Sequence, residues 1–192
     1  MPRQMLFTRR EVEKAALELT REKGIGALSA RSLGQRLGSS SKPIFSLYEN
    51  MEEVRAAVIR AANEEYQRFL AEDMQAGRYP PYKASGMAYI RFAREERELF
   101  RLLFMRDRSG ESHEQNDEEI EPLLDLICRN LGVDRKTARK LHLEMWIFVH
   151  GIASMIATAY LEWDEPTVSE AVSDVYHGLI GRLCAGKEKN HA

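Results

Sequence analysis

Strand signals are almost absent from this chain. No alternating run of β-branched and aromatic residues occurs, whereas periodic segments rich in Ala, Leu, Glu, Arg and Met recur from Thr8 to Leu183. The 192 residues are enough for one sizeable core, or for a small domain joined to a larger one. The sequence therefore predicts an all-α protein.

The chain also lacks the residue groupings that catalysis and metal binding need. Its five histidines lie too far apart for a ligand pair at i,i+4, and no cysteine or carboxylate joins them at metal-ligand spacing. No nucleophile motif and no glycine-rich phosphate loop occurs. We therefore expect no enzyme activity, no metal site and no cofactor.

Cysteine is scarce, and long apolar runs are too. Cys128 and Cys184 sit in apolar helical patterns and are expected to be buried thiols.

No secretory signal opens the chain, which favours a cytoplasmic protein. The one long uncharged run, residues 145–161, approaches the lower limit of a membrane span, but His150 and small polar residues interrupt it. We expect a helix buried between layers of a bundle, and no membrane.

The stretch from Ser29 to Asn50 has the pattern of a helix-turn-helix. Its apolar residues form two short helical stripes separated by Gly38 and three serines: Leu33, Leu37, Ile44, Phe45 and Tyr48. Ser29 is the expected N-cap of the first helix, and Gly38 allows a sharp turn. Pro43 fits the first turn of a second helix, expected over residues 41–48. The N-terminal end of that short helix can enter a major groove of DNA.

The charge distribution favours the same interpretation. Residues 1–48 carry nine Lys and Arg against four Asp and Glu, a net charge of +5, whereas the remainder carries nineteen against twenty-six, a net −7. A polyanion would be attracted to residues 1–50, here called the head, although a merely solvated basic face is the alternative. The expected DNA-binding residues are Arg31, Ser39, Ser40, Ser41, Lys42, Pro43, Phe45, Ser46, Leu47 and Tyr48.

Further helices are predicted along the rest of the chain. Thr8 and Glu11 form a capping box for a first helix that ends at Gly24. After the head we expect a connecting helix and several body helices, with a polar loop over residues 107–119 and Pro122 in the first turn of the helix that follows it. The expected ranges are 50–74, 81–93, 95–106, 120–131, 134–161 and 165–185.

The last two helices are the expected dimer interface. The helix over residues 134–161 is apolar on two sides, so it must pack on both. The helix over residues 165–185 has an apolar stripe from Val168 to Leu183, and Gly178 and Gly181 permit close backbone approach. A two-fold homodimer through these helices would place two heads on successive turns of a palindromic site.

The head resembles that of the tetracycline-repressor (TetR) family of bacterial transcription regulators over residues 8 to about 58. The family's Thr or Ser, Ile-Ala pair, glycine turn, Tyr-x-x-Phe and Asn/Ser-Lys stand here as Ser29, Leu33-Gly34, Gly38, Phe45-x-x-Tyr48 and Asn50-Met51. The resemblance implies a DNA-binding head and an all-helical body that binds a ligand and dimerises. Phe45 and Met51 depart from the family's Tyr and Lys and remove phosphate contacts, which puts more weight on Lys42, Arg31 and the serines.

The body is similar to the ligand-binding and dimerisation domain of that family. Trp146-x-x-x-His150-Gly151 looks like the Trp…His-Gly signature of one subgroup. The alternative for His150 is a hydrogen-bonded core histidine, and an aromatic cluster at helical spacing is core by default. The residues expected to bind a small, largely apolar effector are Phe100, Phe104, Trp146, His150 and Tyr160.

Together these observations predict a ligand-responsive transcriptional regulator, a repressor with activation as the alternative, that binds a palindromic operator in double-stranded DNA as a homodimer. The helix-turn-helix DNA-binding domain would comprise residues 1–50, and the ligand-binding and dimerisation domain residues 51–192. The alternative is a helical adaptor that binds another protein through its apolar helix and has no specific affinity for DNA.

Overall fold

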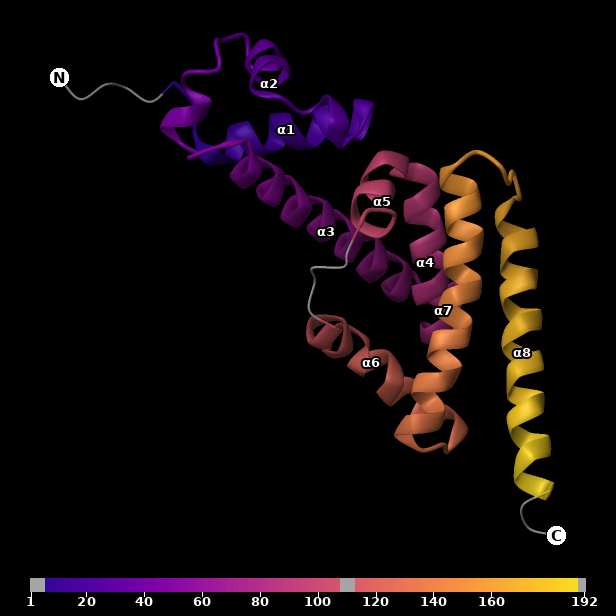
Figure 1. The fold of residues 1–192 in the computed structure, drawn as a ribbon. Helices are drawn as coiled ribbons and strands as arrows, with labels where there is room; N and C mark the ends of the chain where they lie inside the picture. The colour runs from indigo at the N-terminus through magenta and orange to yellow at the C-terminus, as the bar shows by residue number, and fades with distance from the viewer. Residues whose placement is uncertain (1–5, 108–112, 190–192) are drawn as a thin grey trace. The chain divides into compact units, whose positions relative to one another are not determined.

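All regular structure that the computed structural model describes is helical, as predicted (Figure 1). The structure describes the backbone of residues 6–107 and 113–189, and the side chains of residues 6–107 and 120–183. The elements in chain order are α1 (Arg9–Lys23), the 3₁₀ turn η1 (Ile25–Ala27), α2 (Ala30–Arg36), the 3₁₀ turn η2 (Ile44–Ser46), α3 (Met51–Ala76), α4 (Pro81–Glu95), α5 (Arg97–Phe104), α6 (His113–Leu131), α7 (Arg135–Ala157) and α8 (Glu165–Lys189).

The chain forms two compact units. The first unit contains the residues up to Phe69 together with Phe92–Arg106, and the second contains Leu70–Arg91 and the residues from Asp107 onward. Helices α3 and α4 therefore each contribute residues to both units. The first unit is discontinuous in sequence, since α5 belongs with the head and not with the helices that follow it.

Helix ends in the first unit follow the predicted capping residues. The Thr8 side chain accepts a hydrogen bond from the backbone N–H of Glu11, whose own carboxylate accepts from the N–H of Thr8, so the capping box is confirmed. Helix α1 ends at Lys23, and Gly24 follows it with a φ of +76°. Ser29 caps α2, also as predicted.

The core of the first unit has an apolar part under the head and an aromatic part beside α5. The apolar side chains Val12, Ala16, Leu28, Leu33, Ile44 and Val54 are fully buried. Tyr66 contacts both Phe92 and Phe104, with ring centroids 5.4 and 5.3 Å apart, and Phe100 packs against Phe104 at 5.2 Å. Helix α5 also packs against α1. Residues distant in sequence therefore hold the head in place.

The second unit is built around α7, which packs against α6 and α8 (Figure 1). Its inward face is apolar: Ala138, Leu141, Met145, Val149, Ile152 and Ile156 are buried. Polar contacts join α4 to its neighbours, since Lys83 Nζ donates to the hydroxyls of Ser169 and Ser173 on α8 at 2.6 and 2.7 Å. Cys128, expected to be buried, is only half-buried, and the side chain of Cys184 lies outside the described residues.

Helix α6 differs most from the prediction. It begins at His113, so residues 113–119, expected in a polar loop, are helical, and Pro122 lies inside the helix instead of in its first turn. The segment is polar, yet its Glu and Gln residues have high helix propensity, which outweighs the lack of an apolar stripe. Residues 108–112 of the expected loop lie outside the described residues, as does the His113 side chain.

Helix α7 ends earlier than predicted, at Ala157. Ala159 has a φ of +58°, and the N–H of Tyr160 donates to the carbonyl of Met155 at 2.9 Å. This is the geometry of a helix stop that glycine usually supplies, so an alanine in its place carries no recognisable stop signal. Of the helices in the described part of the chain, none combines the length and apolar character needed to cross a bilayer.

Candidate nucleic-acid interface

Helix α2 is fixed at both of its ends. The Ser29 and Ser32 side chains cap each other's backbone N–H groups, at 3.0 and 3.1 Å. Near the other end, the Arg36 guanidinium donates two hydrogen bonds of 2.8 Å to the carboxylate of Glu22 on α1. Such bidentate pairs are geometrically specific, and this one raises the pKa of Arg36 through the hydrogen bond to Glu22. The exposed side chain of Arg31 is thereby presented from an anchored helix.

The serine turn after α2 lies close against the helix backbone. A Cβ added at Gly34 would be 3.0 Å from the carbonyl oxygen of Ser39 and 3.2 Å from the nitrogen of Ser41. The turn itself is made by Gly38, whose φ of +65° confirms its predicted role. Sequence reasoning did not assign Gly34 a function, although a glycine inside a helix is a signal for close backbone approach.

The second helix of the motif is shorter than predicted. Instead of a helix over residues 41–48, the structure has a single 3₁₀ turn, Ile44–Ser46. The Ser46 hydroxyl donates to the carbonyl of Pro43 at 2.6 Å, so a side chain takes an acceptor that a longer α-helix would use. The serines preceding Lys42 are also poor formers of helix interiors. The motif therefore presents a compact turn.

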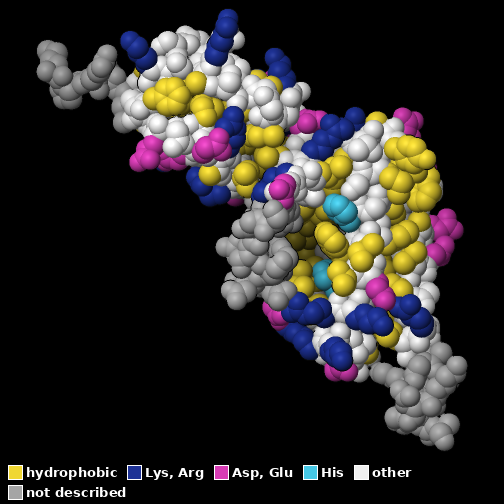
Figure 2. Space-filling model, viewed as in Figure 1, with side chains coloured by type: hydrophobic (Ala, Val, Ile, Leu, Met, Phe, Trp, Pro, Cys, Tyr) yellow, Lys and Arg dark blue, Asp and Glu magenta, His cyan; other side chains and the backbone are white. Residues whose placement is uncertain are grey.

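This turn, η2, has one buried and one exposed side. Ile44 is fully buried beneath it, whereas Phe45 is 46% exposed and Ser46 and Lys42 are exposed. Of the other predicted contact residues, Ser40 is exposed and Ser39, Ser41, Pro43 and Leu47 are half-buried. Figure 2 shows Lys and Arg side chains projecting from the outer edge of the head, while acidic side chains gather on another side of it.

Tyr48 has a supporting position. Its side chain is 2% exposed, and its hydroxyl donates to the Glu13 carboxylate at 3.1 Å. The Arg9 guanidinium lies 4.7 Å from the ring centroid and donates to the carbonyl of Leu47 at 2.6 Å. Burial, together with the hydrogen bond to Glu13, raises the pKa of Tyr48 to about 12. This side chain therefore anchors η2 to α1 from below and does not reach the outer surface, unlike Phe45.

The start of α3 is also capped by side-chain hydrogen bonds. The Asn50 side-chain oxygen accepts a hydrogen bond from the N–H of Glu53 at 3.0 Å, and Glu53 in turn accepts from the N–H of Glu49 at 2.8 Å. These bonds satisfy N–H groups that the first helical turn leaves open. That hydrogen bond from Glu49 also lowers the pKa of Glu53. Met51 begins the helix and is half-buried.

The five residues expected to bind an effector fall into two groups. Phe100 and Phe104 belong to the first unit, and Phe100 is fully buried. The others, Trp146, His150 and Tyr160, belong to the second unit, where Trp146 stacks on His150 with ring centroids 5.0 Å apart.

Within the second unit these three residues differ in environment. The Nδ1 of His150 is 2.8 Å from the Tyr89 hydroxyl, and its Nε2 is 3.2 Å from the Ser154 hydroxyl. Burial lowers the pKa of His150, so the neutral ring is favoured. Tyr160 is 81% exposed beyond the end of α7. Among the described residues no group of three His, Cys, Asp or Glu is arranged to hold a metal ion.

Comparisons with known proteins complete these observations. Residues 82–178 match the family model "Tetracyclin repressor-like, C-terminal domain". The fold is similar to the crystal structure of a TetR-like transcriptional regulator from Rhodococcus sp. RHA1, with a TM-score of 0.63 and 16% sequence identity over 92% of this chain and 95% of that chain. No curated protein sequence matches. Because the matched segment is just over half of the chain, the chain belongs to the tetracycline-repressor (TetR) family of transcriptional regulators, which are not enzymes.

Proposed function

We propose that this regulator is a cytoplasmic repressor that binds a palindromic operator as a homodimer and releases it in response to a small effector. The observation that carries the proposal is the construction of η2. Ile44 and Tyr48 hold the turn from below, so that Phe45, Ser46 and Lys42 face outward on a rigid support. A rigid support matters because base contacts demand a fixed register on the duplex.

The exposed groups divide by the chemistry they offer DNA. Arg31 and Lys42 carry positive charge and would contact phosphates, which gives affinity without sequence preference. The Ser46 hydroxyl can reach base edges, and the exposed ring of Phe45 can contact a thymine methyl group. Leu47 is half-buried and would contribute only its outer edge.

Dimerisation is supported by the outer face of α7. Its exposed side chains include Leu143, Trp146 and Ile147, spaced three and four residues apart and therefore on one side of the helix. Figure 2 shows hydrophobic side chains gathered over α7 and α8 on the face in view. A second copy of the chain would remove this surface from water, and two-fold pairing would give the protein two heads for the two halves of a palindrome.

The experiment that tests the proposal is selection of bound sequences from random duplex DNA. We expect a palindrome, because a symmetric dimer presents the same η2 surface to both half-sites. A protein that shows no preference, and no binding to any duplex at low salt, would instead be a helical adaptor that binds another protein.

Variants of the head then test which residues carry the binding. Lys42→Ala and Arg31→Ala should each weaken binding to all duplexes and reduce the slope of log affinity against log salt by about 0.9 for each phosphate that is no longer neutralised. Arg129→Ala is the matched control, since Arg129 is an exposed arginine on α6. Equal salt slopes for all three variants would contradict the placement of the interface.

A further inference from the structure

A cavity of about 490 Å³ lies within the first unit, between η1, the first turns of α3, and α5. This volume is in the range of sites that hold small organic molecules. The apolar part of its lining includes Ile25, Ile59 and Leu102. None of the five residues expected to bind an effector lines it, and neither do the exposed residues of η2. The cavity is therefore separate from both predicted sites.

Charged side chains complete the lining, and positive charge prevails among them. Three arginines, Arg55, Arg101 and Arg106, line the cavity together with two carboxylates, Glu52 and Glu98. Each carboxylate pairs with the arginine three residues further along its own helix: Glu52 with Arg55, and Glu98 with Arg101 at 2.7 Å. Partly exposed pairs of this kind are weak, so a bound anion can compete with the carboxylates for the guanidinium groups.

Glu98 also contacts the head. A Cβ added at Gly24 would lie 2.8 Å from Oε2 of Glu98, so the carboxylate packs directly against the glycine that ends α1. Nearby, the Arg21 side chain of α1 donates to Glu96 at 2.7 Å. One wall of the cavity is thus part of the contact between α5 and the end of α1.

From this arrangement we propose that the cavity binds a small organic anion, a monocarboxylate with an apolar body, and that binding draws Arg101 away from Glu98. The anion's charged end lies among the guanidinium groups, where charge-assisted hydrogen bonds are strongest, and its apolar body lies against Ile59 and Leu102. Because Glu98 is then released from Arg101, its contact with Gly24 changes, and so does the support of the head by α5. The regulatory consequence, which rests on the proposed function, is that the bound anion lowers the affinity of the protein for the operator.

The first experiment needs no DNA. Decanoate is titrated into the full-length protein by calorimetry, with decanol as the uncharged probe. We expect decanoate to bind and decanol to bind at least about tenfold more weakly, because decanol cannot form the charge-assisted hydrogen bond. Equal binding of the two probes would overturn the proposal, since it would indicate a merely apolar patch.

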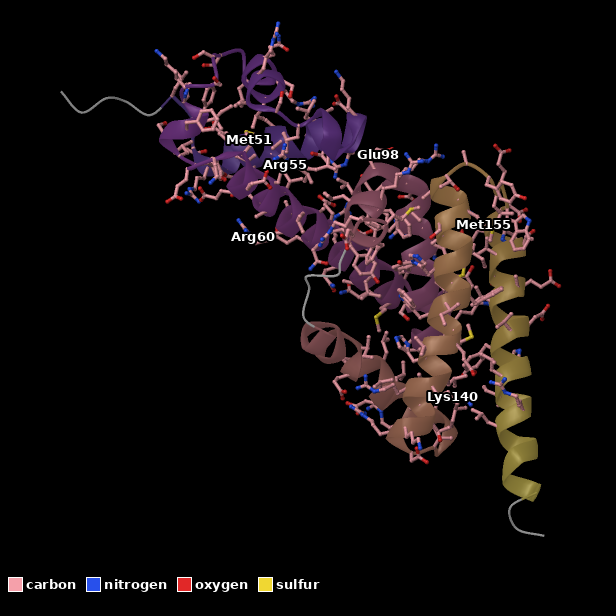
Figure 3. The ribbon with its side chains drawn as sticks, in the orientation of Figure 1. Met51, Arg55, Arg60, Glu98, Lys140 and Met155 are labelled. Atoms are coloured by element: carbon pink, nitrogen blue, oxygen red, sulfur yellow. The ribbon has the colours of Figure 1, made fainter. Side chains whose placement is uncertain are left out.

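Three variants locate the binding site. Arg101→Gln should weaken decanoate binding by about tenfold or more, because one guanidinium is removed. Glu98→Gln should tighten it, because a competing carboxylate is removed, and partial unfolding cannot produce that sign. Arg60→Gln is the control: Arg60 lies on the same helix as Arg55 but projects from a different side and does not line the cavity (Figure 3). If Arg101→Gln and Glu98→Gln shift affinity in the same direction, or match Arg60→Gln, the site assignment is wrong.

The second experiment measures operator affinity with and without saturating decanoate. A fall of about 5- to 150-fold, absent in Arg101→Gln, would support the regulatory half of the proposal. If decanoate binds as expected but operator affinity does not change, the regulatory half of the proposal is wrong and the assignment of the binding site is retained. A protein that binds no duplex at all would refute the proposed function, and with it the regulation, while the calorimetric result would still decide the site.

Discussion

Gly34 shows how a single missing side chain positions a surface. The serine backbone of residues 39–41 lies only 3.0–3.2 Å from the position that a Cβ would take, so η2 starts from a point set by close contact with α2. The exposed residues that we assign to DNA contact, Lys42 and Ser46, follow directly from that point in the chain. Gly34, which has no side chain, therefore determines where the side chains assigned to DNA contact are presented.

This close approach leads to a prediction about stability. Gly34→Val should lower the free energy of unfolding by about 1–3 kcal/mol, because added carbons must displace backbone atoms and not a flexible side chain. Thermal denaturation followed by circular dichroism measures the effect. Gly26→Val is the matched control, since a Cβ at Gly26 has no atom within 4 Å. Indistinguishable melting temperatures for the two variants would mean that the serine turn can move away from an added side chain without loss of stability.

The correct predictions for single residues were local ones. The caps at Thr8 and Ser29 and the turn at Gly38 were correct because each depends on neighbours within a few residues. The contacts of Tyr48 could not be predicted in this way, since its partners Glu13 and Arg9 lie more than thirty residues earlier. An aromatic residue in a recognition motif is interpreted as a contact residue until its tertiary partners are known.

Helices α4 and α7 are joined by two tyrosine–histidine pairs. The Tyr82 hydroxyl lies 3.2 Å from Nδ1 of His142, and the Tyr89 hydroxyl lies 2.8 Å from Nδ1 of His150. Burial lowers the pKa of both histidines, and nearby Arg139 lowers that of His142 further. Burial also raises the pKa of Tyr82, so both members of that pair are neutral near pH 7.

These lowered pKa values make stability depend on pH in a defined direction. Above the unfolded-state pKa of about 6.5 the histidines are neutral in both states, so they add no pH dependence there. As the pH falls below that value the unfolded chain binds protons more readily, and the native state loses stability until the folded pKa is passed. Urea denaturation between pH 8 and pH 5 should therefore show a falling midpoint.

His142→Gln isolates one pair, because glutamine can still bond to Tyr82 and does not titrate. The urea midpoint of this variant should fall less between pH 7 and pH 5 than the midpoint of the parent protein. His177→Gln serves as the control, since His177 is exposed on α8. Parallel pH profiles for the parent and His142→Gln would show that the acid sensitivity arises elsewhere.

Elements were predictable where periodicity and capping agreed. Helix α3 matched its expected range to within two residues, and α6 ends at Leu131 before Gly132, as predicted. Three elements differ from their predicted ranges, each for a separate physical reason. The polar start of α6 lacks an apolar stripe, η2 is shortened by competition from a side-chain hydrogen bond, and α7 is stopped by Ala159 in a conformation that alanine rarely adopts.

The exposed face of α7 leads to a prediction about how complete chains assemble. Ile147 is 58% exposed in the single chain and belongs to the outer apolar stripe. If two copies pair through this stripe, Ile147→Glu buries an unpaired carboxylate against its symmetry mate and should convert a dimer into a monomer. Light scattering at micromolar concentration measures this directly.

The control for assembly is Met74→Glu, because Met74 is an exposed apolar residue on a different helix, α3. It should remain dimeric. Monomeric parent protein would contradict dimerisation altogether, whereas an Ile147→Glu variant that stays dimeric while folded would assign dimerisation to another surface. Val175 and Leu179 on α8, half-buried in the single chain, would be the next positions to substitute.

The discontinuous first unit has a consequence for how such regulators can exchange their heads by recombination. A single crossover after residue 50 would carry α1, α2 and η2 into another protein and leave behind α5, with the Glu96 that holds Arg21 and the Glu98 that packs on Gly24. A chimera of that kind inherits a head without its support. New operator preferences should therefore arise more readily by point substitutions at exposed positions such as Phe45 and Ser46, and an engineered chimera should transfer α5 together with the head.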